Sequence, residues 1–147
     1  MRACTSCTAC CKTLGVHELA KQPGVACAHE NAHGCARYAS RPPTCRSFYC
    51  CWLDERRGWA DLERPDLSGL ICYEAGGVPY TVTTGLPIFV AIEVLEGAFV
   101  RQRPILDRIS ARYLVVLCLG LTKRRLIGPA AQVELGELML RAGKPLL

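Results

Sequence analysis

Cysteines crowd the first third of this chain at spacings that are typical of metal sites. The opening run CTSCTACC places Cys4, Cys7, Cys10 and Cys11 within eight residues. A C-x-x-C spacing lets two thiolates from one tight turn reach a single ion. Here the spacing is repeated once before an adjacent pair ends the run, so we expect this segment to bind metal.

The adjacent pair cannot point both thiols in one direction. In a helix, Cys4, Cys7 and Cys11 would share a face and Cys10 would lie about 100° from Cys11. In a strand, neighbouring side chains also diverge. We therefore expect one thiol of the pair to bind an ion shared with the preceding cysteines and the other to reach a second ion or the core. Whether the segment is a short helix or a loop stays open.

A second group of thiols is more widely spaced, as is normal when loops bring ligands together around an ion. It comprises Cys27, Cys35, Cys45 and Cys50. His29 and His33 lie within this stretch, but thiols are abundant and softer ligands. Both histidines are better interpreted as solvated loop residues, and His17 as a surface residue.

Disulfide bonds explain the cysteines less well than metal does. The count of eleven is odd, so complete internal pairing is impossible. No apolar segment resembling a secretory signal follows Arg2, which predicts a cytoplasmic protein whose thiols stay reduced. Isolated cysteines are often small core residues, and this is the prediction for Cys72 and Cys118, which lie in apolar runs.

An iron–sulfur cluster remains an alternative. C-x-x-C-x-x-C is the bacterial iron–sulfur run, whose last ligand comes from elsewhere, and Cys45 could supply it. However, a proline precedes Cys45 in RPPTC instead of following it, and the Cys10–Cys11 pair is foreign to that run. The spacing permits a cluster without requiring one.

The cysteine pattern resembles that of the YkgJ-type cysteine-cluster family, which is described as zinc- or iron-chelating. The resemblance rests on the CxxCxxCC run and on the phrase RPPTCRSFYC, and it covers residues 4 to 53. It implies eight metal ligands: Cys4, Cys7, Cys10, Cys11, Cys27, Cys35, Cys45 and Cys50. Cys51 falls where the family pattern varies and is extra. The resemblance implies metal binding and no specific activity, so whether the protein is an enzyme is undecided.

Arg41 and Arg46 flank Cys45 and could offset the negative charge of clustered thiolates. They are equally well interpreted as ordinary surface or phosphate-seeking residues.

The elements that must position these thiols belong to a small α+β fold. We expect residues 1–62 to form an irregular metal-binding region and residues 63–147 to form a strand and helix region of the same domain, joined by the turn-rich connector 63–69. Two or three strands are expected in 71–84 and 86–99, an amphipathic helix in 103–114, a buried strand in 115–121 with an antiparallel neighbour in 122–128, and a helix in 131–144 that ends at Gly143.

Composition excludes several other functions. No apolar run approaches the roughly 20 residues of a membrane span, and no P-loop or GxSxG motif occurs. The net charge is +5, but the basic run Lys123–Arg125 is short and lacks aromatic residues, so nucleic-acid binding is not expected. The predicted function is zinc or iron binding. The alternatives are an iron–sulfur redox or enzyme component and a zinc-stabilised nucleic-acid or protein adaptor.

Overall fold

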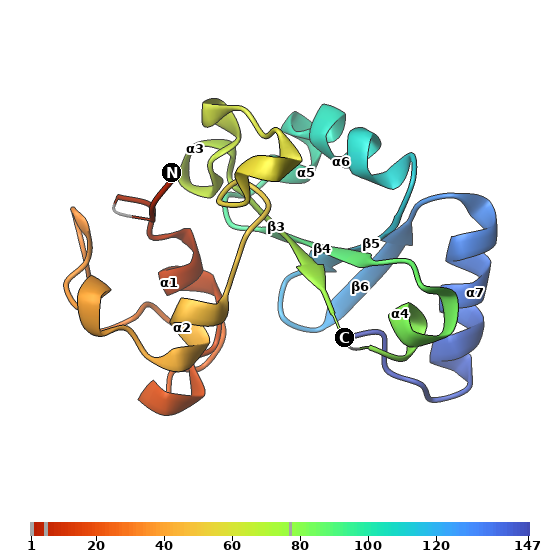
Figure 1. The fold of residues 1–147 in the computed structure, drawn as a ribbon, viewed down its shortest axis with the longest axis horizontal. Helices are drawn as coiled ribbons and strands as arrows, with labels where there is room; N and C mark the ends of the chain where they lie inside the picture. The colour runs from red at the N-terminus through yellow and green to blue at the C-terminus, as the bar shows by residue number, and fades with distance from the viewer. Residues whose placement is uncertain (1, 5, 77) are drawn as a thin grey trace.

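An irregular cysteine-rich part precedes a layered part built on a β-sheet (Figure 1). The computed structural model describes residues 2–4, 6–76 and 78–147. Regular structure in the first part consists of short helices (α), 3-10 helices (η) and a small hairpin. In chain order these are α1 (Ala9–Thr13), η1 (His17–Leu19), β1 (Glu30–Asn31), β2 (Gly34–Cys35), η2 (Tyr38–Ser40), α2 (Pro43–Ser47), η3 (Glu55–Arg57) and η4 (Asp61–Glu63).

A four-stranded sheet with the strand order β3, β4, β5, β6 forms the second part. β3 (Leu70–Ala75) is antiparallel to β4 (Ile88–Glu93), β4 is parallel to β5 (Leu114–Leu119), and β5 is antiparallel to β6 (Lys123–Ile127). Parallel neighbours require a crossover, which α5 (Ala98–Arg101) and α6 (Arg103–Ser110) supply. The other helices are α3 (Pro65–Ser68), α4 (Pro79–Thr84) and α7 (Ala130–Arg141). The α+β prediction is confirmed.

Helices cover both faces of the sheet. Successive side chains of a strand point to opposite faces, so Leu114 and Val116 of β5 enter one buried cluster while Val115 and Leu117 enter the other. α4 and α7 pack against the first face, and α6 packs against the second (Figure 1). This alternation gives the small sheet a core on each side.

The cysteine-rich part is attached along the outer edge of β3. Cys50 pairs with Tyr73 in an antiparallel bridge, and the Cys51 N–H donates to the carbonyl of Cys72 at 2.7 Å. Trp52 and other side chains of residues 1–62 share a buried cluster with β3, β4, β5 and α6. The two regions therefore have one core in common.

Most of the elements expected after residue 63 are present, with one difference. The helix α6, the strands β5 and β6 and the helix α7 lie where they were predicted, and Gly143 follows α7 with a φ of +73°. The β-branched run at 80–84 is part of α4 instead of a strand. Pro79 occupies its first turn and Gly85, with a φ of +68°, ends it, so the end signals outweigh the strand propensity of the run.

β6 forms the second edge of the sheet and is strongly basic. Lys123, Arg124 and Arg125 are all exposed there. Basic residues on an edge strand oppose pairing with another chain, which gives this run a structural role. Among the described residues, no helix is long and apolar enough to cross a membrane.

Candidate metal centre

A cavity of about 420 Å³ lies among the cysteine-rich segments and beside Tyr73 of β3. Of the eight cysteines predicted as ligands, all but Cys50 line it: Cys4, Cys7, Cys10, Cys11, Cys27, Cys35 and Cys45. The fold thus brings thiols from both predicted groups to one place. Aromatic and basic side chains, among them Tyr38, Phe48 and Arg41, complete the wall.

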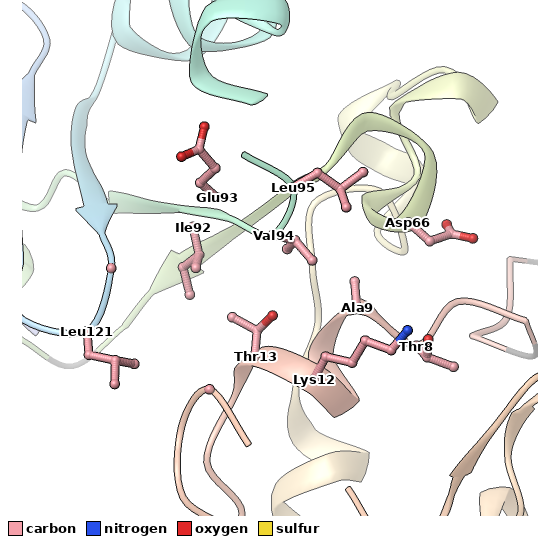
Figure 2. A pocket seen from close by; sticks show the side chains of 12 residues that line it. Thr8, Ala9, Lys12, Thr13, Asp66, Ile92, Glu93, Val94, Leu95 and Leu121 are labelled. Atoms are coloured by element: carbon pink, nitrogen blue, oxygen red, sulfur yellow. The ribbon is translucent and has the colours of Figure 1, made fainter. Parts of the chain in front are cut away.

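The short helix α1 presents opposite faces to two cavities. It begins at Ala9, so Cys4 and Cys7 precede it and the fully helical arrangement of the opening run is not formed. Cys10 and Cys11 line the thiol cavity, and Cys10 also packs against the core. Because successive helical side chains lie about 100° apart, the other face of the segment lines a second cavity of about 360 Å³ against the end of β4. Figure 2 shows the residues on that side: Thr8, Ala9, Lys12 and Thr13.

Backbone hydrogen bonds bring the second group of cysteines to α1. The Cys27 N–H donates to the Cys11 carbonyl at 3.0 Å, and the Glu30 N–H donates to the Cys27 carbonyl at 3.0 Å. The β1–β2 hairpin pairs Glu30 with Cys35. Gly34 adopts a φ of +122° next to that pair, a conformation that favours glycine. The hairpin therefore fixes Cys35 relative to Cys27 and Cys11.

α2 supplies Cys45, and η1 holds the helix in place. Pro43 stands in the first turn of α2, where its missing N–H costs nothing. The Glu18 carboxylate of η1 accepts hydrogen bonds from the Thr44 N–H at 3.0 Å and from the Thr44 hydroxyl at 2.9 Å. This contact spans 26 residues of sequence and ties the start of α2 to η1, whose Leu19 lines the cavity.

Cys7 is subject to opposing effects. It is 8% exposed, and burial raises its pKa. The N–H groups of Ala9 and Asp66 donate to its sulfur and oppose the rise, whereas the Asp66 carboxylate adds to it through its negative charge and by accepting a hydrogen bond from the thiol. Hydrogen bonds from N–H groups favour the thiolate. Arg64 in turn binds the Asp66 carboxylate through Nε at 2.6 Å and Nη2 at 2.9 Å. Sequence reasoning missed both residues, because the connector 63–69 shows only turn signals.

Cys50 is buried just outside the cavity wall. It is 6% exposed, and its sulfur accepts hydrogen bonds from the N–H groups of Trp52 and Leu53. Its charge is the one that most raises the pKa of Cys4, so the two thiols are near each other. Burial nevertheless raises the pKa of Cys50, so its surroundings favour the neutral thiol.

The remaining cysteines lie in the core. Cys72 is 2% exposed and Cys118 is 5% exposed, which confirms the prediction for both. Cys51, which was not predicted as a ligand, is 1% exposed and also belongs to the core cluster. These thiols are separate from the cavity wall.

The thiols of the cavity differ in how readily they lose a proton. Burial, reinforced by the charges of Cys50 and Cys7, raises the pKa of Cys4 to about 11. The pKa of Cys11 falls to about 7, because the Cys10 thiol donates a hydrogen bond to it and Lys21 and Arg41 are nearby. A metal ion must therefore displace protons from most of these thiols when it binds.

Two basic side chains on the wall supply positive charge. Lys21 is only 9% exposed, and its ammonium group donates to the carbonyls of Leu14 and, at 3.4 Å, Gln22. The Arg41 guanidinium lies 3.7 Å from the ring centroid of Tyr38 and donates from Nε to the Tyr38 carbonyl at 3.0 Å. Arg46 is exposed and is not among the lining residues. No sequence pattern indicated that Lys21 belongs to the site.

The histidines take different positions. His29 is half-buried on the cavity wall, with Nε2 3.4 Å from Nη1 of Arg37. His33 is exposed at the hairpin turn, where its N–H donates to the Asn31 side chain at 2.8 Å. His17 is exposed, as a surface residue should be. The loop interpretation fits His33, whereas His29 is close to the thiols.

The cysteines surround the cavity without converging on a point. In the described part of the chain, no group of three His, Cys, Asp or Glu side chains is placed so that it could hold a metal ion. The thiols line the wall at separations wider than coordination requires.

The chain has no match among protein-family models, curated proteins or solved structures. The resemblance to the YkgJ-type family therefore stays a prediction. What is known of the site comes from the position of the thiols and from the groups around them.

Proposed function

We propose that residues 4–51 form a metal–thiolate centre that binds zinc or iron. Its candidate ligands are the cysteines predicted from the sequence, Cys4, Cys7, Cys10, Cys11, Cys27, Cys35, Cys45 and Cys50. The observation that carries the proposal is the shared cavity, since the fold draws all but one of these thiols from separate segments to one wall.

The chemistry of the wall suits a soft cation. Thiolates select zinc and iron–sulfur centres among the common metals. Each ligand cysteine would lose its proton to solvent on binding, and the cation would supply positive charge where burial now favours the neutral thiols. Lys21 and Arg41 would offset part of the charge that remains.

Binding requires the thiols to move inward from the wall. The segments that carry them are short helices, a two-residue hairpin and loops, and such segments rearrange at low cost compared with a packed sheet. Structural metal sites commonly gain their order from the metal itself. The centre would accordingly stabilise the cysteine-rich part.

The test is the metal content of the full chain, purified without oxygen or chelator. Elemental analysis, an assay for acid-labile sulfide and X-ray absorption should find zinc or iron with sulfur neighbours, at about 2.3 Å for zinc. Iron with labile sulfide and visible absorbance would favour the iron–sulfur alternative. Protein that contains neither a transition metal nor sulfide would refute the proposal.

A further inference from the structure

We propose that the outer edge of β6 binds an extended, acidic segment of a partner protein, which joins the four-stranded sheet as a further strand. The partner is defined by a short run of aspartate or glutamate residues. The interaction does not depend on the metal centre, because none of the described residues of β6 lines the cysteine cavity.

The backbone of β6 is available for pairing. β6 is the last strand of the sheet, with β5 as its neighbour, whereas the opposite edge at β3 is covered by Cys50 and Cys51. A strand with a neighbour on one side leaves part of its N–H and C=O groups facing solvent. The five residues of β6 pair one by one with 119–115 of β5, so its edge is an even ladder that a further strand can extend.

Charge is the feature that decides which strand can pair there. Lys123, Arg124 and Arg125 are exposed, and successive side chains of a strand point to opposite faces, so both faces of the edge are positive. Like charges on neighbouring strands destabilise their pairing, and opposite charges stabilise it. The run therefore repels β6 of another copy and favours an acidic strand, which is how charge gives specificity.

The three cations are free to bind a partner. Within residues 2–4, 6–76 and 78–147, none of the ion pairs involves any of them. The Arg124 guanidinium donates instead to the neutral carbonyls of Lys123 at 3.0 Å and Leu121 at 3.2 Å. A carboxylate is a stronger acceptor for a guanidinium than a neutral carbonyl is, so an acidic partner would replace these bonds with better ones.

The extent of the positive charge favours a short peptide over a nucleic acid. Leu126 and Ile127, which follow the run, pack against the two core clusters. Glu134 and Glu137 of α7 line an open cavity beside Ile127, so a long polyanion would meet carboxylates there. Residues 119–128 also contain no aromatic side chain on which bases could stack. An acidic segment about as long as the basic run fits this surface better.

The test is fluorescence anisotropy of a labelled peptide with three consecutive glutamates flanked by valine and threonine, titrated with the full-length protein. Binding should be saturable and should weaken as salt is added. The same peptide N-methylated at alternate amides keeps its charges but loses backbone donors, so it should bind about tenfold more weakly or less. Equal binding of the two peptides would show attraction by charge alone and would overturn the added strand.

Two further probes check the partner. The peptide with lysine in place of glutamate should not bind. A single-stranded oligonucleotide that binds more tightly than the glutamate peptide would assign the run to nucleic acid and overturn the proposal, as would failure of the glutamate peptide to bind at millimolar concentration. Hydrogen exchange should show new protection in residues 122–128 when the peptide is bound, and protection confined to another segment would place the site elsewhere.

A matched pair of variants tests the location. Arg125→Glu should weaken binding of the glutamate peptide about tenfold or more. Arg46→Glu makes the same change of net charge at an exposed position of α2 and should leave the affinity nearly unchanged. Equal weakening by the two variants would show an effect of net charge and overturn the site. Both positions are exposed, and the peptide comparisons on the wild type decide the question if either variant does not fold.

Discussion

Cys7 is held between groups with opposite effects on its ionisation. Burial and the Asp66 carboxylate raise its pKa, and two backbone N–H groups, one from Ala9 and one from Asp66, donate to its sulfur and lower it. Groups that orient and stabilise a ligand in this way usually matter nearly as much as the ligand. Asp66 comes from the connector to the sheet, so Cys7 links the cavity to the second part of the molecule.

Replacing Cys7 by serine should release about half of the bound metal or more, because one four-ligand site loses a thiolate. Cys118→Ser is the matched control, since Cys118 is similarly buried but lies in β5 away from the cavity. Both variants should lose about 1–3 kcal/mol of stability from a buried hydroxyl. Elemental analysis separates them, and equal metal content in the two would remove Cys7 from the ligand set.

Tyr80, on the other side of the sheet, is the subject of a separate prediction. It is fully buried, and its hydroxyl lies 3.3 Å from Oε1 of Gln132. Burial raises its pKa above the usual value of 10, so its contribution to stability is complete below pH 10 and decreases as the pH rises further.

Tyr80→Phe should cost about 1 kcal/mol at neutral pH through the lost hydrogen bond. The difference in the free energy of unfolding between wild type and variant should shrink above pH 10. Only the wild type loses stability there, because its buried phenol stays protonated while the phenol of the unfolded chain ionises. Urea unfolding from pH 7 to pH 11 measures this difference. A difference that does not change with pH would contradict the assignment.

At the scale of elements, the β1–β2 hairpin has more influence on the cavity than its four strand residues suggest. Its register places Cys35 opposite Glu30, and Cys27 is tied to both Glu30 and Cys11 by backbone hydrogen bonds. The φ of +122° at Gly34 makes that register possible.

Gly34→Ala should lower metal affinity, because the strain of about 1–2 kcal/mol falls on the hairpin that positions Cys35. Gly120→Ala is the control: Gly120 has a φ of +73° with open space around its Cβ position, in the turn between β5 and β6. It should lose comparable stability and keep its metal affinity. Competition with a coloured chelator measures both affinities, and unchanged affinity in Gly34→Ala would argue against a role for the hairpin.

Elements with strong local signals could be predicted from the sequence, and those shaped by distant contacts could not. The amphipathic pattern of 103–114 and the apolar run at 115–121 predicted α6 and β5, because each carries its own periodicity. Of the two or three strands expected in 71–84 and 86–99, two form, and the β-branched run at 80–84 is helical because Pro79 and Gly85 mark the ends of a helix. The hairpin at 30–35 had no recognisable strand pattern.

At the scale of the whole molecule, the sheet has a core that is independent of the cavity. The cluster around Leu114, Tyr80 and Met139 lies on the face covered by α4 and α7. The cluster on the opposite face is shared with the cysteine-rich part. The sheet should therefore keep its order under conditions that disorder the cysteine-rich part.

A chelator added to metal-loaded protein should accelerate amide hydrogen exchange throughout residues 4–51 and leave β4, β5 and α7 protected. The reason is that short elements without a core of their own open locally at low cost. Hydrogen exchange followed by mass spectrometry resolves the two parts. Uniform loss of protection over the whole chain would show that the sheet depends on the metal as well.

The list of thiols at the site was accessible from the sequence, but their surroundings were not. The resemblance to the YkgJ-type family implied eight ligands, and the fold brings seven of them to one cavity. Lys21, Asp66 and Arg64 act through the folded chain, since each reaches the thiols from a segment with no motif. The exclusion of Cys50 from the wall likewise depends on how residues 50–51 pair with β3.

That pairing also protects the edge of the sheet against self-association. Residues 50 and 51 occupy hydrogen-bonding positions along β3, where an uncovered strand would attract the strand of another molecule. The basic residues of β6 repel the same strand of another molecule, whereas the edge of β3 is covered only by this short stretch of backbone. If the first fifty residues lost their order, the edge of β3 would be exposed, and self-association would begin at that strand.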